Sequence, residues 1–467
     1  MMITRKIYSF AIHFIYFCVL PLGSLFSQVR AAVPFLGFTP FPYALSQSDS
    51  VQKFTYDRIA LDGNIIAHHF DDGIPWNEAF ADSLFPSSIV SDWNTRIAHT
   101  PVQHKVYVAI TPINILRNGL ALNKNNNGGD QPLPPPWDTL PFHAPQVKKA
   151  FLNYCKRIID TFHPEYIAIG IEVNLLKKET PALWASYVEL HSYIYVELKK
   201  KYPMLPIFVS CTGFDLAGFT SANQSEQVKA LHDIIPWSDY FGLSLHPQLS
   251  VFMAEVVPSQ QILDSICLLS QKPIAICETS YPAEYFTVYN NSLIYNGTAQ
   301  KQHQYISNLI SLSQQREIIF IINFILRDYD QLWSEIGSPD DINKIWKDTG
   351  FYTENGEPRE VLQLWKKYIL NVEQERNNVP QRVTLHQNYP NPFNPSTVIS
   401  YQVPENSYVL LKVYDAIGKE VETMVDEVKE AGNYSVQFNG KTLSSGMYFA
   451  RLQSGDKVQL RKMMLVK

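Results

Sequence analysis

The sequence predicts a (β/α)8 barrel of the TIM type followed by a small all-β, immunoglobulin-like sandwich. Eight short apolar runs alternate with longer amphipathic stretches between residues 34 and 330. Eight strands alternating with helices over roughly 250–300 residues is the count of a barrel. A doubly wound open sheet is the alternative, and it fits less well because no run carries a glycine-rich phosphate loop.

The eight runs are rich in β-branched and aromatic residues, and their hydrophobicity is nearly continuous. A parallel strand that is covered on both faces needs this pattern. The stretches between the runs place apolar residues at helical spacing, as in Gln146–Phe162, Trp184–Leu198 and Gln302–Ser313. The predicted strands are Phe35–Tyr43, Asn64–Phe70, Lys105–Asn114, Tyr166–Asn174, Ile207–Phe214, Tyr240–His246, Pro273–Glu278 and Ile318–Leu326.

The first 32 residues read as a secretory signal peptide. Arg5 and Lys6 precede an apolar run, Ile7 to Leu20, and small residues follow it. A membrane anchor is the alternative, but the run is shorter than the ~20 residues that a spanning helix needs. No later segment is apolar for long enough, so we expect no transmembrane span in the mature protein.

Composition narrows the class of protein further. A net charge of −5 argues against a nucleic-acid-binding protein, which usually has a basic face. The four cysteines beyond the signal lack the close pairing of a zinc site, and we expect neither a metal nor another cofactor. They are Cys155, Cys211, Cys267 and Cys277, and their disulfide state stays open.

Changes in composition and pattern along the chain indicate its domain boundaries. We expect the barrel domain over residues 33–370, a polar linker over 371–383 and the β-sandwich over 384–467. The long loop from Leu116 to Pro145 is rich in Asn, Gly and Pro and follows the third predicted strand. Loops of this length are usually functional or disordered. In a barrel this one would lie over the carboxyl ends of the strands, where active sites form.

The tail carries the most specific motif in the chain. The segment Tyr389 to Thr397 reads YPNPFNPST, and Val413-Tyr414-Asp415 with a later Leu443–Tyr448 segment continues the pattern. This tail resembles the C-terminal sorting domain of the type IX secretion system. The resemblance implies export to the periplasm, transport by the type IX machinery, and release or attachment at the outer surface. A carbohydrate-binding sandwich is the alternative.

Two glutamates end predicted strands. Glu172 ends the fourth run, YIAIGIEVN, and Glu278 ends the seventh, PIAICETSYP. Catalytic residues of barrels cluster at the carboxyl ends of strands, so the two carboxylates should face each other across the mouth. Paired carboxylates hydrolyse glycosidic bonds, one as general acid and the other as nucleophile or base.

This arrangement resembles clan A of the glycoside hydrolases, and more distantly the endo-galactanase-like members. The resemblance implies a retaining double displacement with Glu172 as acid/base and Glu278 as nucleophile. In these members an aromatic residue from the sixth strand approaches the nucleophile, and His246 holds that place here. One position departs from the pattern: Ile171 stands where clan A has an Asn, and Asn174 is a possible substitute.

Other polar and aromatic residues near strand ends are candidates for substrate binding. Polar groups beside an aromatic plane form a sugar subsite. The candidates are His69, Asp71, Trp76, Asn114, Asn174, His246 and Trp333.

The sequence therefore predicts a secreted, cofactor-independent retaining glycosidase acting on a polysaccharide or oligosaccharide. Endo-action on a β-linked galactan or mannan is the favoured substrate hypothesis. A non-catalytic surface protein that binds glycans or acts as an adhesin is the alternative, and the missing Asn before Glu172 favours it.

Overall fold

The computed structural model describes residues 33–45, 49–126, 129–252, 255–378 and 382–467. The signal peptide predicted over residues 1–32 lies outside these ranges. Within them, no helix is both long enough and apolar enough to cross a bilayer.

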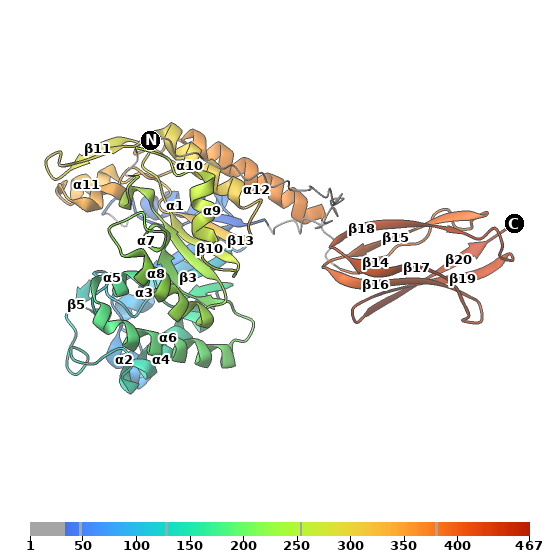
Figure 1. The fold of residues 1–467 in the computed structure, drawn as a ribbon, viewed down its shortest axis with the longest axis horizontal. Coiled ribbons are helices and arrows are strands. Elements are labelled where there is room, and N and C mark those ends of the chain that lie inside the picture. The colour runs from blue at the N-terminus through green and yellow to red at the C-terminus, as the bar shows by residue number, and fades with distance from the viewer. Residues whose placement is uncertain (1–32, 46–48, 127–128, 253–254, 379–381) are drawn as a thin grey trace, which may run out of the picture.

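The first domain is a barrel of parallel strands, as predicted (Figure 1). The hydrogen-bonded order is β7-β6-β3-β2-β1-β13-β10-β9-β8, and β7 and β8 at its two ends are separated in the chain by Val209 alone. They are two halves of one strand, so the sheet closes on itself and each of the eight predicted runs supplies one barrel strand. The strands are β1 Phe35–Phe38, β2 Ile65–Phe70, β3 Lys105–Ile110, β6 Tyr166–Ala168, β7 Ile207–Phe208, β8 Ser210–Thr212, β9 Phe241–Leu245, β10 Ile274–Thr279 and β13 Ile318–Asn323.

Apolar side chains fill the barrel on both faces of the sheet. Inside, Tyr107 stacks on Phe208 and packs against Phe320, with ring centroids 5.9 and 4.8 Å apart. Outside, the helices bury their apolar faces on the strands, which explains the continuous hydrophobicity of the runs. The longer helices are α1 Asp49–Asp62, α3 Ser87–His99, α4 Pro145–Phe162, α6 Trp184–Lys201, α8 Gln224–Ile234, α9 Gln260–Cys267, α10 Ala299–Leu312 and α12 Glu360–Asn378.

Short elements follow the carboxyl ends of the strands and build the mouth of the barrel. The predicted long loop contains a small hairpin and lies against α2, where Trp137 stacks on Trp76. A second hairpin follows β10. These elements are α2 Trp76–Ala81, β4 Asn123–Lys124, β5 Asp130–Gln131, α5 Asn174–Glu179, α7 Gly213–Leu216, β11 Tyr285–Val288, β12 Leu293–Asn296 and α11 Asp330–Glu335.

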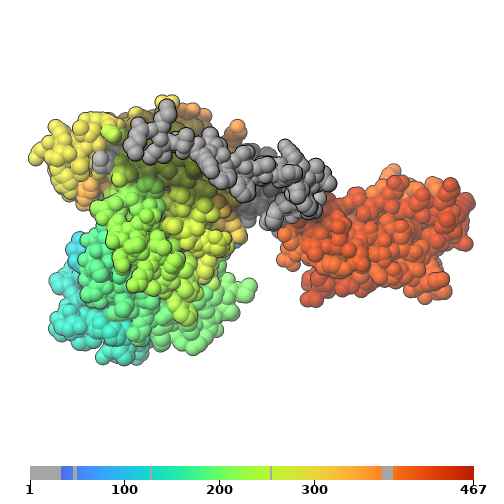
Figure 2. Space-filling view, viewed as in Figure 1, coloured from blue at the N-terminus to red at the C-terminus, as the bar shows by residue number. Residues whose placement is uncertain are grey.

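The C-terminal domain is an antiparallel sandwich that forms a lobe of its own (Figures 1 and 2). A three-stranded sheet, β14-β15-β18, packs on a four-stranded sheet, β17-β16-β19-β20, and their inward side chains form a separate core. Helix α12 extends to Asn378, so the predicted linker over 371–383 begins inside this helix. The strands are β14 Thr384–Leu385, β15 Ser396–Val403, β16 Ser407–Asp415, β17 Glu420–Lys429, β18 Gly432–Asn439, β19 Gly446–Ser454 and β20 Lys457–Leu465.

The four cysteines that the structure describes are buried free thiols, namely Cys155, Cys211, Cys267 and Cys277. They pack as small apolar side chains within the barrel domain.

Candidate active site

A pocket of about 640 Å³ opens at the carboxyl ends of the barrel strands. It contains both predicted carboxylates, and loops after the first, second, third, sixth and eighth strands supply most of its wall. The lining side chains used below are His69, Asp71, Arg117, Glu172, His246, Glu278, Phe324 and Trp346.

Glu172 lies in the turn after β6, four residues beyond the end of that strand. Its φ of 48° is in the left-handed region, which side chains other than Gly and Asn rarely adopt. The turn is held because the Glu172 amide donates a hydrogen bond to Ser210 Oγ at 2.9 Å. Gly170 lies beneath it, where a Cβ atom would come within 2.6 Å of the Tyr187 hydroxyl. Such local strain persists at functional sites because the surrounding structure enforces it.

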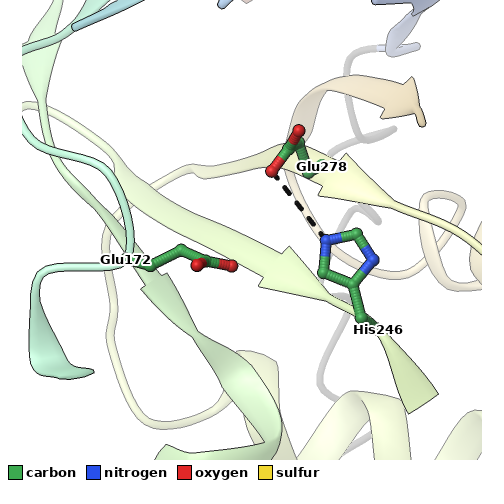
Figure 3. A group of neighbouring side chains, drawn as sticks. All are labelled: Glu172, His246 and Glu278. Atoms are coloured by element: carbon green, nitrogen blue, oxygen red, sulfur yellow. Dashed lines mark ion pairs between the residues drawn. The ribbon is translucent and has the colours of Figure 1, made fainter. Parts of the chain in front are cut away.

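Glu278 is the penultimate residue of β10, and two histidines face its carboxylate. His69 Nδ1 from β2 lies 3.6 Å from Oε1, and His246 Nε2 from the end of β9 lies 3.9 Å from Oε2. Figure 3 shows Glu172 pointing toward the space between His246 and Glu278. One oxygen of each glutamate and one ring nitrogen of His246 all lie within 4.8 Å of one another.

The two carboxylates have opposite pKa shifts. Burial raises the pKa of Glu172, and the nearby charge of Glu278 raises it further, against the lowering effect of Arg117. Burial also opposes ionisation of Glu278, but His69, His246 and Arg117 together hold its pKa below the usual value. Two acids whose environments separate their pKa values in this way are suited to acid and nucleophile roles.

Arg117 is the cation beside the pair. It comes from the loop after β3, is 5% exposed and binds both oxygens of Asp71, at 2.8 and 2.6 Å. Its Nη2 also lies 3.4 Å from Glu172 Oε2. A bidentate pair of this kind fixes the plane of the guanidinium and therefore its distance from the Glu172 carboxylate.

An aromatic wall flanks the histidine side of the pocket. The Trp346 ring packs edge-on against His246 with centroids 4.7 Å apart, and it also contacts Phe324 at 5.6 Å. Beside it, Lys347 forms ion pairs with Asp330 and Asp348. Burial raises the pKa of Asp348 to about 6. This buried network anchors the segment that carries Trp346.

The structure places the predicted substrate-binding residues in two groups. His69, Asp71 and His246 line the pocket. Trp76 is fully buried and packs on Trp137, and Trp333 packs with Ile325 and Tyr329, so both are core residues. Tryptophans of both kinds come shortly after strands in the chain, so a single sequence does not distinguish a tryptophan in the core from one that lines a pocket.

The two asparagines also lie apart from the pocket wall. Asn114 Nδ2 donates to Asn118 within its own loop. Asn174 is fully buried and donates to Thr212 and Gln227, so it does not replace the missing Asn of clan A. Ile171 packs inside the barrel, with an exposure of 2%.

Arg117 and Trp346 are two of the pocket residues that the sequence reasoning missed. Arg117 lies within the long loop predicted to cover the mouth, where it and Lys124 are the two cationic side chains, and this was the available signal. Trp346 follows the eighth strand by more than twenty residues, and nothing in the local sequence relates it to the glutamates.

Among the residues that the structure describes, three groups of side chains have donor atoms close enough together to ligate an ion. One is the site itself, formed by Glu172, His246 and Glu278. The other two surround Asp328, where Arg359 already pairs with the carboxylate at 2.6 Å.

Comparison with known families identifies the tail. Residues 387–467 match the secretion system C-terminal sorting domain. No curated protein matches the chain by sequence. The protein is therefore secreted or surface-attached through the type IX system.

Solved structures with a similar fold are glycosidase-related. A GH5_18 protein from Streptomyces cattleya in complex with GlcNAc has 12% identity and a TM-score of 0.51, covering 74% of this chain and 82% of that one. The exo-β-1,4-mannosidase Op5Man5 from Opitutaceae bacterium strain TAV5 has 13% identity and a TM-score of 0.50, covering 78% and 65%.

A third similar structure is the FMN-binding β-glucuronidase from Facaelibacterium prausnitzii L2-6, at 10% identity and a TM-score of 0.44. The match covers 93% of this chain and 56% of the β-glucuronidase, so the chain spans little more than half the length of that enzyme. At these identities the likeness shows the fold alone. The chain thus combines a barrel that shares the fold of glycoside hydrolases with a type IX secretion sorting domain.

Proposed function

We propose that the protein is a retaining glycoside hydrolase that cleaves an extracellular polysaccharide or oligosaccharide. The observation that carries the proposal is the carboxylate pair, whose oxygens approach within 4.8 Å and whose pKa values shift in opposite directions. Retaining enzymes separate the two carboxyl groups by about 5–5.5 Å, whereas inverting enzymes leave ~6.5–9.5 Å for a water molecule.

The chemistry proceeds in two displacements. Glu278 attacks the anomeric carbon while the glycosidic C–O bond breaks, and Glu172 gives its proton to the leaving oxygen. Glu172, now a carboxylate, then takes a proton from water as the water oxygen attacks the same carbon. This second step breaks the bond to Glu278 and restores both side chains to their starting states.

The stereochemistry of the product tests the mechanism. We expect soluble oligosaccharides with the anomeric configuration of the substrate, observed by proton NMR before mutarotation. The substrate panel includes β-linked galactan and β-linked mannan, the substrates that the sequence favours, and oligosaccharides containing GlcNAc. One similar structure is an exo-β-1,4-mannosidase, and another is in complex with GlcNAc. Products with the opposite configuration would assign an inverting mechanism and remove the nucleophile role from Glu278.

Trp346 is the aromatic platform in this proposal. Substituting Trp346→Ala is expected to raise KM about ten- to a hundredfold with a smaller effect on kcat, because a ring that stacks on a sugar contributes to binding throughout the reaction. Trp237→Ala is the matched control, since Trp237 is 37% exposed and lies outside the pocket lining. Equal KM values for both variants would place the substrate elsewhere in the pocket.

A non-catalytic glycan-binding protein is the second candidate. The buried Ile171, in the place of the clan A Asn, is the observation that favours it. Binding to immobilised glycans without release of reducing sugar from any of them, with and without added divalent metal, would support this candidate.

A further inference from the structure

Behind Glu278, three buried side chains form a hydrogen-bonded series. Gln248 Nε2 donates to Ser280 Oγ at 2.7 Å, and Ser280 Oγ lies 2.9 Å from His246 Nδ1. Ser280 is fully buried, and Gln248 and His246 are 1% and 5% exposed. Figure 3 shows that the other ring nitrogen of His246 is the one facing Glu278.

The hydrogen-bond donors and acceptors in this series determine the tautomer of the His246 imidazole. The amide nitrogen of Gln248 is a donor only, so the serine oxygen accepts its hydrogen bond. The serine has one proton, and His246 Nδ1 is its remaining partner among the residues described. Donation to Nδ1 leaves the proton of a neutral imidazole on Nε2, the atom 3.9 Å from Glu278 Oε2.

The tautomer with the proton on Nδ1 is disfavoured because it leaves polar groups without suitable partners. If Nδ1 carried the proton, the buried serine proton would lack an acceptor, and the Nε2 lone pair would face a carboxylate. A rotated Gln248 amide, with its oxygen toward Ser280, would reverse this preference. The direction of the amide therefore determines whether Nε2, the nitrogen that faces Glu278, carries the proton.

We propose that Ser280 and Gln248 are positioning residues that fix His246 in the tautomer whose Nε2–H faces Glu278. In the hydrolase proposed above, on which this role rests, that proton stabilises the ionised nucleophile. At 3.9 Å the contact is longer than a hydrogen bond, and catalytic hydrogen bonds commonly tighten when substrate binds.

Other charged groups also face Glu278 and His246. His69 lies 3.6 Å from Glu278 Oε1, and Arg117 and Glu172 complete the charges around the two side chains. Because the side-chain hydrogen bonds of Ser280 go to His246 and Gln248 and not to these three residues, its substitution changes the His246 contribution and leaves theirs in place.

Nitrogen-15 NMR of the full-length, histidine-labelled protein at alkaline pH measures the tautomer without any substrate. Signals absent from His246→Gln identify His246 among the 12 histidines. We expect the Nε2–H form in the wild type, and a mixture of both forms in Ser280→Ala. The matched control is Ser250→Ala, a buried serine in the segment after β9 that also carries Gln248; its hydroxyl donates to the Pro247 carbonyl and not to His246. A wild type in the Nδ1–H form, or an unchanged tautomer in Ser280→Ala, would overturn the proposal.

The pH profile supplies the functional readout. We expect the acidic limb of kcat/KM to move up by about 0.5 to 1 pH unit in Ser280→Ala and to stay in place in Ser250→Ala. An unmoved limb in Ser280→Ala would contradict the stabilising role. If the wild type hydrolyses nothing, the hydrolase proposal fails, while the NMR result still decides the tautomer.

Discussion

Replacing Glu278 with Gln is expected to lower kcat/KM on the best substrate by about 10⁴-fold or more, while the protein stays folded. The amide cannot form the glycosyl-enzyme, and losses of this order follow removal of a nucleophile. Reducing-sugar release and the circular dichroism of the two proteins measure the change and the fold. Mass spectrometry of the wild type with a slow 2-fluoroglycoside should locate the covalent sugar on Glu278.

Two further experiments test whether the loss is specific to Glu278. Glu284→Gln changes a glutamate six residues further along, whose carboxylate pairs with Arg359 outside the pocket lining, and we expect nearly full activity from it. Supplying azide to Glu278→Ala should restore turnover and produce the glycosyl azide of opposite configuration. Equal activity of wild type and Glu278→Gln would exclude Glu278 as the nucleophile.

Replacing Arg117 with Met is expected to combine a loss of stability with an altered pH profile. Removal of the guanidinium leaves the Asp71 carboxylate, whose side chain is 12% exposed, without its partner, which costs about 3–5 kcal/mol of unfolding free energy. The pKa values of both glutamates should rise, because Arg117 lowers each of them. The acidic limb follows ionisation of Glu278 and the alkaline limb follows deprotonation of Glu172. Both limbs should therefore move to higher pH.

Arg316→Met is the matched control for this prediction. Arg316 also binds an aspartate through two nitrogens, at 2.6 and 3.0 Å from Asp264, but the pair is about one-third exposed and lies outside the pocket lining. We expect it to cost no more than about 1 kcal/mol and to leave the pH profile unchanged. Denaturant titration and kcat/KM between pH 4 and 9 (roughly the range over which carboxylates and histidines titrate) measure both effects. A profile that does not move in Arg117→Met would remove Arg117 from the control of the pair.

The topology of the barrel also sets the direction in which the site faces. Helix α12 runs antiparallel to the strands in a βα unit, so its last residues lead away from the mouth and toward the sorting domain (Figure 1). The pocket and the end of α12 therefore lie at opposite ends of the barrel.

The sequence by itself determined the number and order of the barrel strands. Burial on both faces requires continuous apolar runs, and such runs can be recognised from the local sequence alone. It also identified the sorting domain, whose motif is local. Glu172 and Glu278 were predicted as a facing pair from strand number alone, since the carboxyl ends of parallel strands share one edge.

Only the tertiary structure decided which other side chains reach that pair. The left-handed turn of Glu172 depends on Ser210 of the neighbouring strand. Arg117 and Trp346 enter the pocket from loops whose paths the local sequence does not specify. Asn174 and Trp76 follow strands as the pocket-lining residues do, yet they turn into the core. The physical reason is that the burial of a strand depends on the types of a few consecutive residues. The path of a loop depends instead on contacts between residues that are distant in sequence.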